Sequence, residues 1–212
     1  QEYYRVKELL DGKRPSRMDL FTYMDDEIYR ICVSGSHAKE NPFQHYLDFL
    51  YELGELSEDE QKLYAGIGRE FIQTIETTEM QKVYKMPILY SFYNHGNIRL
   101  AVTDEEVLES WKEFFDTGTN WKDFPNVNTY EDYKKVTDKQ HLSKAKRMPI
   151  RFLKASGKGF FVEKDGYALA LRDEIGDVVG NMAFGEQMGD VLGYRSLEYY
   201  RRRYKKNRSE GD

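Results

Sequence analysis

The sequence predicts a mostly helical protein of the α+β class. Apolar residues recur at helical spacing through residues 1–77, whereas short alternating segments typical of strands interrupt the helical pattern between residues 78 and 172. With 212 residues, of which 40% are hydrophobic and 15% aromatic, the chain is long enough to bury a sizeable core. We therefore expect a helical bundle (1–77), a second domain (78–172) and C-terminal basic helices (173–212) packed on that second domain.

Helix signals follow one another through the first part. Residues 2–10 form a helical segment, and Ser16, with an acidic residue three positions later, is typical of a helix N-cap. Residues 43–53 repeat apolar side chains at helical spacing. Ser57 begins a capping-box pattern. After it, apolar residues recur at every fourth position from 63 to 75, which is typical of one face of a helix. These segments predict a small helical bundle with short connections.

The second part mixes helices and strands in an informative order. The expected order is a helix (83–92), a strand (97–102), a second helix (104–115), a basic helical segment (129–157), a strand (160–163), a tight turn (164–166) and a last strand (167–171). We expect Pro149 to kink or restart the basic helix and Gly157 to end it. This order is that of a winged helix-turn-helix domain, in which the third helix enters the DNA groove and the hairpin wing lies beside it.

Charge is segregated along a chain whose formal net charge is −5. Residues 129–158 hold nine basic and three acidic residues, and residues 194–208 hold seven basic residues and one acidic residue. Each segment therefore has a net charge of +6, and the rest of the chain has a net charge of −17. Basic segments of this kind suit a phosphate backbone. Solvated helical faces are the alternative explanation. The first segment coincides with the predicted third helix, which favours nucleic acid.

The candidate nucleic-acid-binding residues come from both basic segments and the hairpin. They are Lys139, Lys144, Lys146, Arg147, Arg151, Lys154, Lys158, Lys164, Arg201, Arg202 and Arg203, and His141 lies among them in sequence. We expect the hairpin tip to contribute less than the third helix, because Asp165 beside Lys164 repels phosphate. The tyrosines around Arg201–Arg203 either stack on bases or pack the last helix against the protein.

No catalytic, cofactor or metal site is expected. The glycines at 66–68 and 157–159 lack the spacing of a phosphate-binding loop. Acidic residues at 163–165 fall at the predicted turn, where turn formation explains them. A metal site could use Cys32, His37, His45 and Asp48, but their spacing matches no familiar pattern. Cys32 acting as a nucleophile with a distant histidine stays an alternative, although a lone cysteine is usually a small core residue.

The same composition points to a cytoplasmic protein without a membrane partner. The sequence has no apolar stretch of spanning length and no apolar core of a signal peptide near its start, and its one cysteine cannot form an internal disulfide. The first residue is Gln rather than Met, which fits a segment of a longer protein.

Several short motifs resemble one family. ETTEMQKVYKMPIL (76–89), FYNHGNI (92–98) and PIRFLK (149–154) are similar to the C-terminal accessory region of bacterial superfamily 2 DNA helicases of the restriction and DNA-defence type. RPSRMDL (14–20) resembles the short helical region that follows the motor in such proteins. The phosphate-binding loop of the motor is absent from this sequence, so the resemblance implies an accessory part, with a helicase motor in the same longer chain as a partner.

Two functions remain open at this point. The first is a non-catalytic DNA-binding accessory domain of a larger ATP-dependent helicase or restriction protein. The alternative is a protein-interaction module that uses the acidic helical half to dock a helicase or nuclease to a partner. Salt separates them, because phosphate binding weakens steeply with salt and an apolar docking surface does not.

Overall fold

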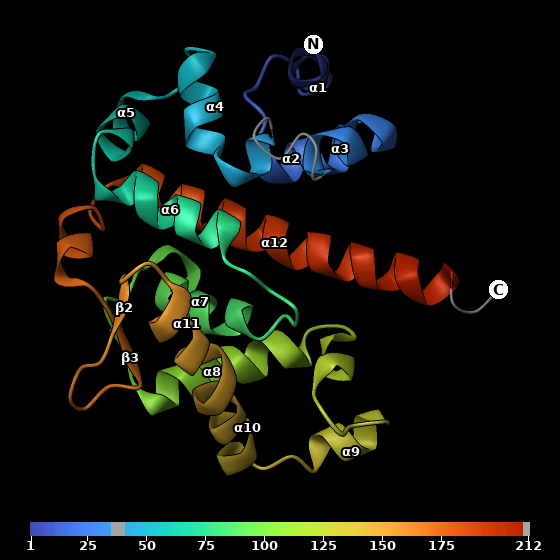
Figure 1. Ribbon diagram of the computed structural model, residues 1–212, viewed down its shortest axis with the longest axis vertical. Helices are drawn as coiled ribbons and strands as arrows, with labels where there is room; N and C mark the ends of the chain where they lie inside the picture. The colour runs from blue at the N-terminus through green and yellow to red at the C-terminus, as the bar shows by residue number, and fades with distance from the viewer. Residues whose placement is uncertain (35–40, 210–212) are drawn as a thin grey trace. The chain divides into compact units, whose positions relative to one another are not determined.

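The computed structural model describes residues 1–34 and 41–209, except the side chains of 206–209, and it divides into two compact units (Figure 1). Unit 1 comprises Gln1–Thr77 and Val178–Asp212, and unit 2 comprises Thr78–Asp177. Most described residues are helical, and the described strands form one small antiparallel sheet, which confirms the predicted class. Among the helices that the structure describes, none is both long and apolar enough to cross a bilayer.

Unit 1 is helical in its described part. Its α-helices are α1 (Glu2–Leu9), α2 (Arg17–Tyr23), α3 (Asp26–Val33), α4 (Tyr46–Glu52), α5 (Glu58–Tyr64), α6 (Ile67–Thr77) and α12 (Met182–Ser209), with a 3-10 turn at Pro42–Gln44. An aromatic core holds α1 to α4 and α12 together, with Phe43 stacked on Tyr194 at 4.6 Å between ring centroids. Ser16 caps α2 in a capping box with Asp19, as predicted.

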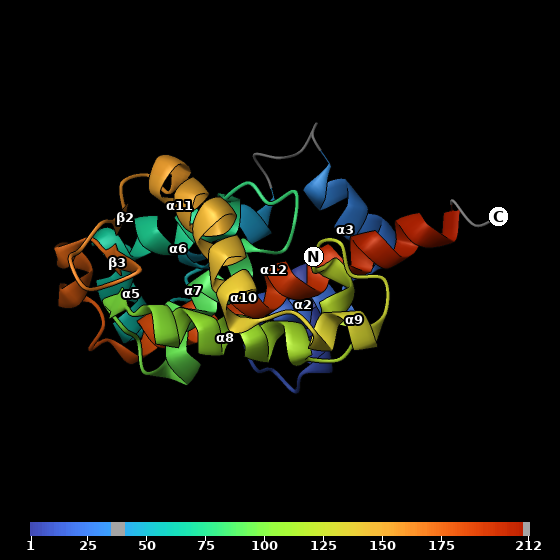
Figure 2. The same cartoon turned by 90° about the horizontal axis from the view of Figure 1, so that it is seen from below.

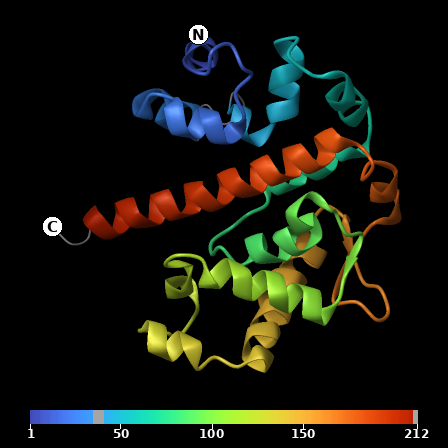
Figure 3. The same ribbon diagram turned by 180° about the vertical axis from the view of Figure 1, so that it is seen from behind.

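The C-terminal helix departs from the sequence prediction. The single helix α12 packs on α2, α5 and α6, and it runs alongside α6 in Figures 1 and 3. Its residues therefore belong to the unit formed by 1–77, rather than to the preceding domain. The physical reason is a buried ion network, in which Arg17 of α2, fully buried, bonds Asp190 of α12 at 2.9 Å. Removing a partner from such a buried charge is costly, so the network ties the chain ends together.

Unit 2 combines helices with the sheet (Figures 1 and 2). Its elements are α7 (Lys85–Tyr93), β1 (Ala101–Val102), α8 (Asp104–Asp116), α9 (Tyr130–Lys134), α10 (Asp138–Ala145), a π-helical turn (Lys146–Ile150), α11 (Arg151–Ser156), β2 (Phe161–Val162) and β3 (Leu169–Leu171), with 3-10 turns at Asn94–Gly96, Asn120–Asp123 and Asp173–Asp177. Strand β3 lies between its neighbours in the order β1-β3-β2, and Ala170 pairs with both Ala101 and Val162.

The basic segment is helical but interrupted. Thr129 caps α9, and Thr137 forms a capping box with Gln140 at the start of α10. Helices α10 and α11 follow one another end to end through the π-helical turn that contains Pro149 (Figure 2). Because proline has no N–H to give to a preceding carbonyl, the wider turn accommodates it without ending the helical path.

The strands are shorter than the sequence predicts. Strand β1 covers only Ala101–Val102 of the expected 97–102, since the N–H of Arg99 bonds the carbonyl of Phe92 instead of a neighbouring strand. The expected tight turn exists, with the N–H of Tyr167 bonded to the carbonyl of Lys164 at 3.1 Å and Gly166 at φ 82°. Together with its flanking residues it forms a hairpin loop from 163 to 168.

Candidate nucleic-acid interface

One side of the α10–α11 segment faces the core of unit 2. His141, Ala145, Ile150 and Leu153 are buried at intervals of three to five residues. His141 is only 3% exposed, and its ring packs against Phe124 at 4.9 Å between centroids. Desolvation lowers the pKa of His141. The basic run thus contains one histidine that is a core residue, which its sequence position did not reveal.

The basic segment also carries exposed cations that are free of ion pairs among the described residues. Lys139, Arg147, Arg151 and Lys158 are exposed, and none of them has an ion-pair partner in the part of the chain that the structure describes. Arg147 and Arg151 lie four residues apart across the π-helical turn. Cations without ion-pair partners can neutralise phosphate without first breaking an ion pair.

Other candidate lysines of this segment are engaged within unit 2. Lys146 pairs with Asp104 at 2.6 Å, which joins the π-helical turn to the start of α8. Lys154 pairs with Glu163 at 2.6 Å, which joins α11 to the hairpin loop. Both pairs offset positive charge of the segment, and the second links the hairpin loop to α11.

Lys144 is also less available than the sequence suggests. Its side chain is partly buried, with Nζ 5.2 Å from the centroid of the Tyr84 ring. Desolvation, and then the neighbouring charge of Arg147, lower the pKa of Lys144. Its cation-π contact belongs to the packing of α10, so we assign Lys144 a structural role.

The hairpin loop is exposed and carries little positive charge. Lys164 lies between Glu163 and Asp165, and its Nζ is 5.3 Å from the ring centroid of Tyr167. One lysine between two carboxylates leaves the tip with a net charge of −1. We therefore still expect the tip to contribute less to phosphate contact than the helix.

The arginines of α12 lie in unit 1 and have protein partners there. Arg201 pairs with Asp26, and its guanidinium lies 5.0 Å from the ring centroid of Phe21. Arg202 pairs with Glu198, and Arg203 donates to the hydroxyl of Tyr199 at 3.2 Å. Tyr199 itself is 6% exposed. The contacts favour the packing role for this end of α12, and the two basic segments belong to different units.

Sequence reasoning missed two exposed aromatic rings beside cations. Phe152 of α11 is 44% exposed with the guanidinium of Arg151 5.7 Å from its ring centroid, and Tyr167 of the hairpin loop is 43% exposed beside Lys164. The sequence could have indicated that Phe152 is exposed, because Phe152 does not belong to the buried stripe of α10–α11 that ends at Leu153. An aromatic ring next to a free cation suits contact with an unstacked base.

The residues that the sequence offered for catalysis or metal binding are explained by their packing and position in the fold. Gly157 packs closely, since a Cβ there would lie 2.4 Å from the Phe161 ring, so this glycine serves helix-sheet contact rather than a phosphate loop. Among the described residues, no three His, Cys, Asp or Glu side chains gather in a way that could hold a metal ion. Cys32 is partly buried, and His37, which we had grouped with it, lies outside the described residues.

Comparisons with known protein families, curated proteins and solved structures give no match for this chain.

Proposed function

We propose that this chain is a non-catalytic DNA-binding accessory module of a larger bacterial ATP-dependent helicase or restriction and defence protein. The observation that carries the proposal is the presence of four exposed cations without ion-pair partners among the described residues along 139–158, on α10–α11 and just after it. The resemblance of residues 76–98 and 149–154 to helicase accessory regions supports the same function.

The topology of unit 2 supports a winged-helix mode of binding. Helices α7, α8 and α10–α11, strand β1 between α7 and α8, and the hairpin β2–β3 follow the expected order, with β3 between β1 and β2. The connection from 117 to 137, which holds α9, is longer than the three or four residues usual between the helices of a helix-turn-helix. In this proposal α10–α11 contacts the duplex and the hairpin lies beside it.

The chemistry assigned to this face is phosphate neutralisation. Four free cations that each displace a counterion give a slope of about −3.6 in a plot of log affinity against log salt concentration. Contacts of this type carry no sequence information, so affinity should be similar for different duplexes.

The test is a salt titration of duplex binding by fluorescence anisotropy. Arg147→Glu with Arg151→Glu should weaken binding to every duplex and make the salt slope shallower by about two. The matched control is Lys134→Glu with Lys135→Glu, which makes the same charge change on α9, where both lysines pair with acidic residues of their own helix. Equal losses from the two double variants would show an effect of net charge alone and remove α10–α11 from the interface.

Single alanine variants rank the helix against the hairpin. Arg147→Ala should cost more affinity than Lys164→Ala at one salt concentration, because the loop around Lys164 has a net charge of −1. A larger loss from Lys164→Ala would make the hairpin the principal contact.

A further inference from the structure

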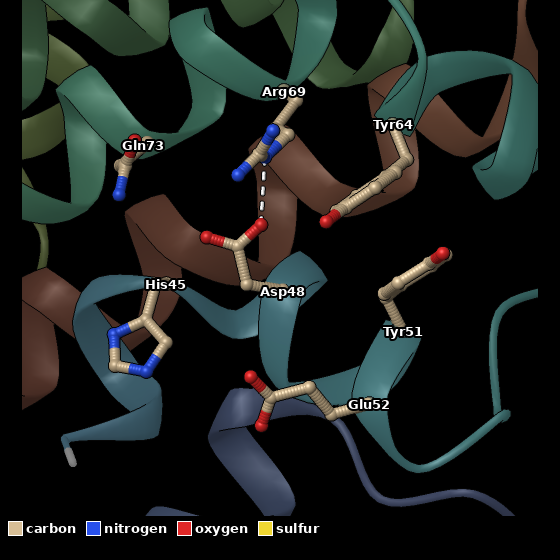
Figure 4. Close-up of a pocket in the computed structure, with 7 residues that line it drawn as sticks. All are labelled: His45, Asp48, Tyr51, Glu52, Tyr64, Arg69 and Gln73. Carbon is tan, nitrogen blue, oxygen red and sulfur yellow. Dashed lines mark ion pairs between the residues drawn. The ribbon is translucent and has the colours of Figure 1, made fainter.

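An open hollow of about 460 Å³ lies in unit 1, far along the chain from the basic segment of unit 2. His45, Asp48, Tyr51 and Glu52 line it from the start and body of α4, and Tyr64 and Arg69 line it from the end of α5 and the start of α6 (Figure 4). The DNA-binding proposal makes no use of these residues. Their chemistry therefore needs its own explanation.

One wall of the hollow is a layered stack. The rings of Tyr51 and Tyr64 are parallel within 6°, with centroids 4.6 Å apart, and the guanidinium carbon of Arg69 lies 4.5 Å from the centroid of Tyr64. Figure 4 shows Tyr64 between Arg69 and Tyr51. Asp48 holds the arginine in place by an ion pair of 2.6 Å to its Nε. The wall is thus preorganised, which reduces the entropy lost on binding.

The outer end of the stack is accessible. Tyr51 is 58% exposed although its ring stacks on Tyr64. An exposed aromatic face accepts another planar or cationic group, and arginine is both.

The charge of the hollow selects a cation. Asp48 and Glu52 outnumber Arg69, and the charge of Arg69 is already matched by Asp48. Glu52 has no ion-pair partner among the described residues. Residues 1–77 as a whole hold sixteen acidic and nine basic residues, a net charge of −7. Two carboxylates would repel a phosphate that entered the hollow. A cation would instead be attracted by Glu52, which no ion pair neutralises among the described residues.

We propose that this hollow binds an arginine side chain from a basic segment of a partner protein. The guanidinium stacks on the exposed ring of Tyr51, and the exposed side chain of Glu52, which Figure 4 draws pointing away from that ring, turns to accept from it. Arginine fits better than lysine, because a planar fork both stacks on a ring and bonds a carboxylate with two N–H groups. This site does not depend on the DNA-binding proposal.

The test uses the full chain and a blocked tripeptide with a central arginine, followed by amide chemical shifts. The matched peptide carries citrulline, which has nearly the same shape without the charge. The arginine peptide should bind and perturb amides of α4, whereas the citrulline peptide should bind several-fold more weakly.

Two variants and two controls locate the contact. Glu52→Gln and Tyr51→Ala should each weaken binding about threefold, and Tyr51→Phe, which keeps the ring, should retain most of it. Glu58→Gln removes one exposed charge from α5, and Tyr23→Ala removes one exposed ring from α2, so both should leave affinity unchanged. Urea unfolding of each variant checks that the fold is kept.

Three results would overturn the proposal. The first is equal binding of the two peptides. The second is a loss of peptide affinity in Glu58→Gln as large as the loss in Glu52→Gln. The third is displacement of the peptide by a single-stranded oligonucleotide whose own binding depends on Tyr51. The last result would assign the hollow to nucleobases instead. None of these outcomes bears on Arg147 or Arg151, so this proposal and the DNA-binding proposal fail separately.

Discussion

Gly166 shows how a single backbone conformation sets the hairpin of unit 2. Its φ of 82° lies in the left-handed region, and a Cβ built at this position would have no heavy atom within 4 Å. The cost of a substitution here is therefore conformational rather than steric contact with neighbours.

We expect Gly166→Val to lower the free energy of unfolding by about 1 kcal/mol or more, because a β-branched residue is strained at positive φ. Gly166→Asn should cost less, since asparagine tolerates the left-handed region. Urea unfolding measures both. If the two variants were equally stable, the turn would have rearranged and positive φ at this position would not be required.

Residue identity also explains where sequence reasoning about the site succeeded and failed. Helix caps depend on neighbours three residues apart, so Ser16 and Ser57 could be recognised from the sequence alone. Whether a lysine is free depends on residues far along the chain, as with Lys146 and Asp104, forty-two positions apart. Exposure and pairing of the candidate cations therefore had to come from the structure.

At the scale of elements, α12 packs on α2 and α6 with the help of buried charges. No pattern in the sequence indicates that these charges are buried. Arg17 was noted only as part of the RPSRMDL motif, yet it is fully buried between Asp190 and Glu76 with its guanidinium carbon 4.7 Å from the ring centroid of Tyr46. No local pattern marks a buried arginine, since lysine and arginine are usually exposed. This explains why residues 178–212 were expected on the preceding domain, whereas the structure groups them with residues 1–77.

The same network gives unit 1 a pH dependence. Glu76 shares Arg17 with a second carboxylate, and desolvation by burial raises the pKa of Glu76 to about 7 despite the arginine. Between its unfolded value near 4.5 and its folded value, the folded protein holds a proton that the unfolded chain has lost. The stabilisation from this proton is present at low pH and is lost as pH rises towards 7.

We therefore expect wild type to lose stability relative to Glu76→Gln, by roughly 2–3 kcal/mol, as pH rises from 5 to 8. Urea unfolding of both proteins across that range measures the difference, and Glu70→Gln, on the exposed side of α6, is the control that should show no trend relative to wild type. A difference between wild type and Glu76→Gln that stays constant with pH would mean that Glu76 is ionised throughout and that Arg17 compensates its burial.

At the scale of the whole molecule, net charge conceals the feature on which the proposed function rests. Unit 2 has sixteen basic and sixteen acidic residues, so its net charge is zero, although residues 129–158 within it carry +6. A local surface rather than the total charge decides whether phosphate is attracted over a distance of about one Debye length. A neutral unit with one basic face is therefore compatible with binding DNA.

The last prediction is that the chain by itself hydrolyses neither ATP nor DNA. The sequence has no G-x-x-x-x-G-K-S/T loop to hold the phosphates of ATP, and the one lysine of the 156–159 segment follows a glycine that packs against Phe161. Metal-dependent cleavage of DNA needs carboxylates that converge on a metal ion, whereas Glu163 pairs with Lys154 and Asp165 lies on an exposed loop. Release of phosphate from ATP, with and without DNA, and nicking of supercoiled plasmid in Mg²⁺ or Mn²⁺ measure the two activities, and both should stay at the level of a buffer blank. Plasmid cleavage that is lost in Glu163→Gln or Asp165→Asn would place a catalytic metal at the hairpin loop and show that the chain is a nuclease.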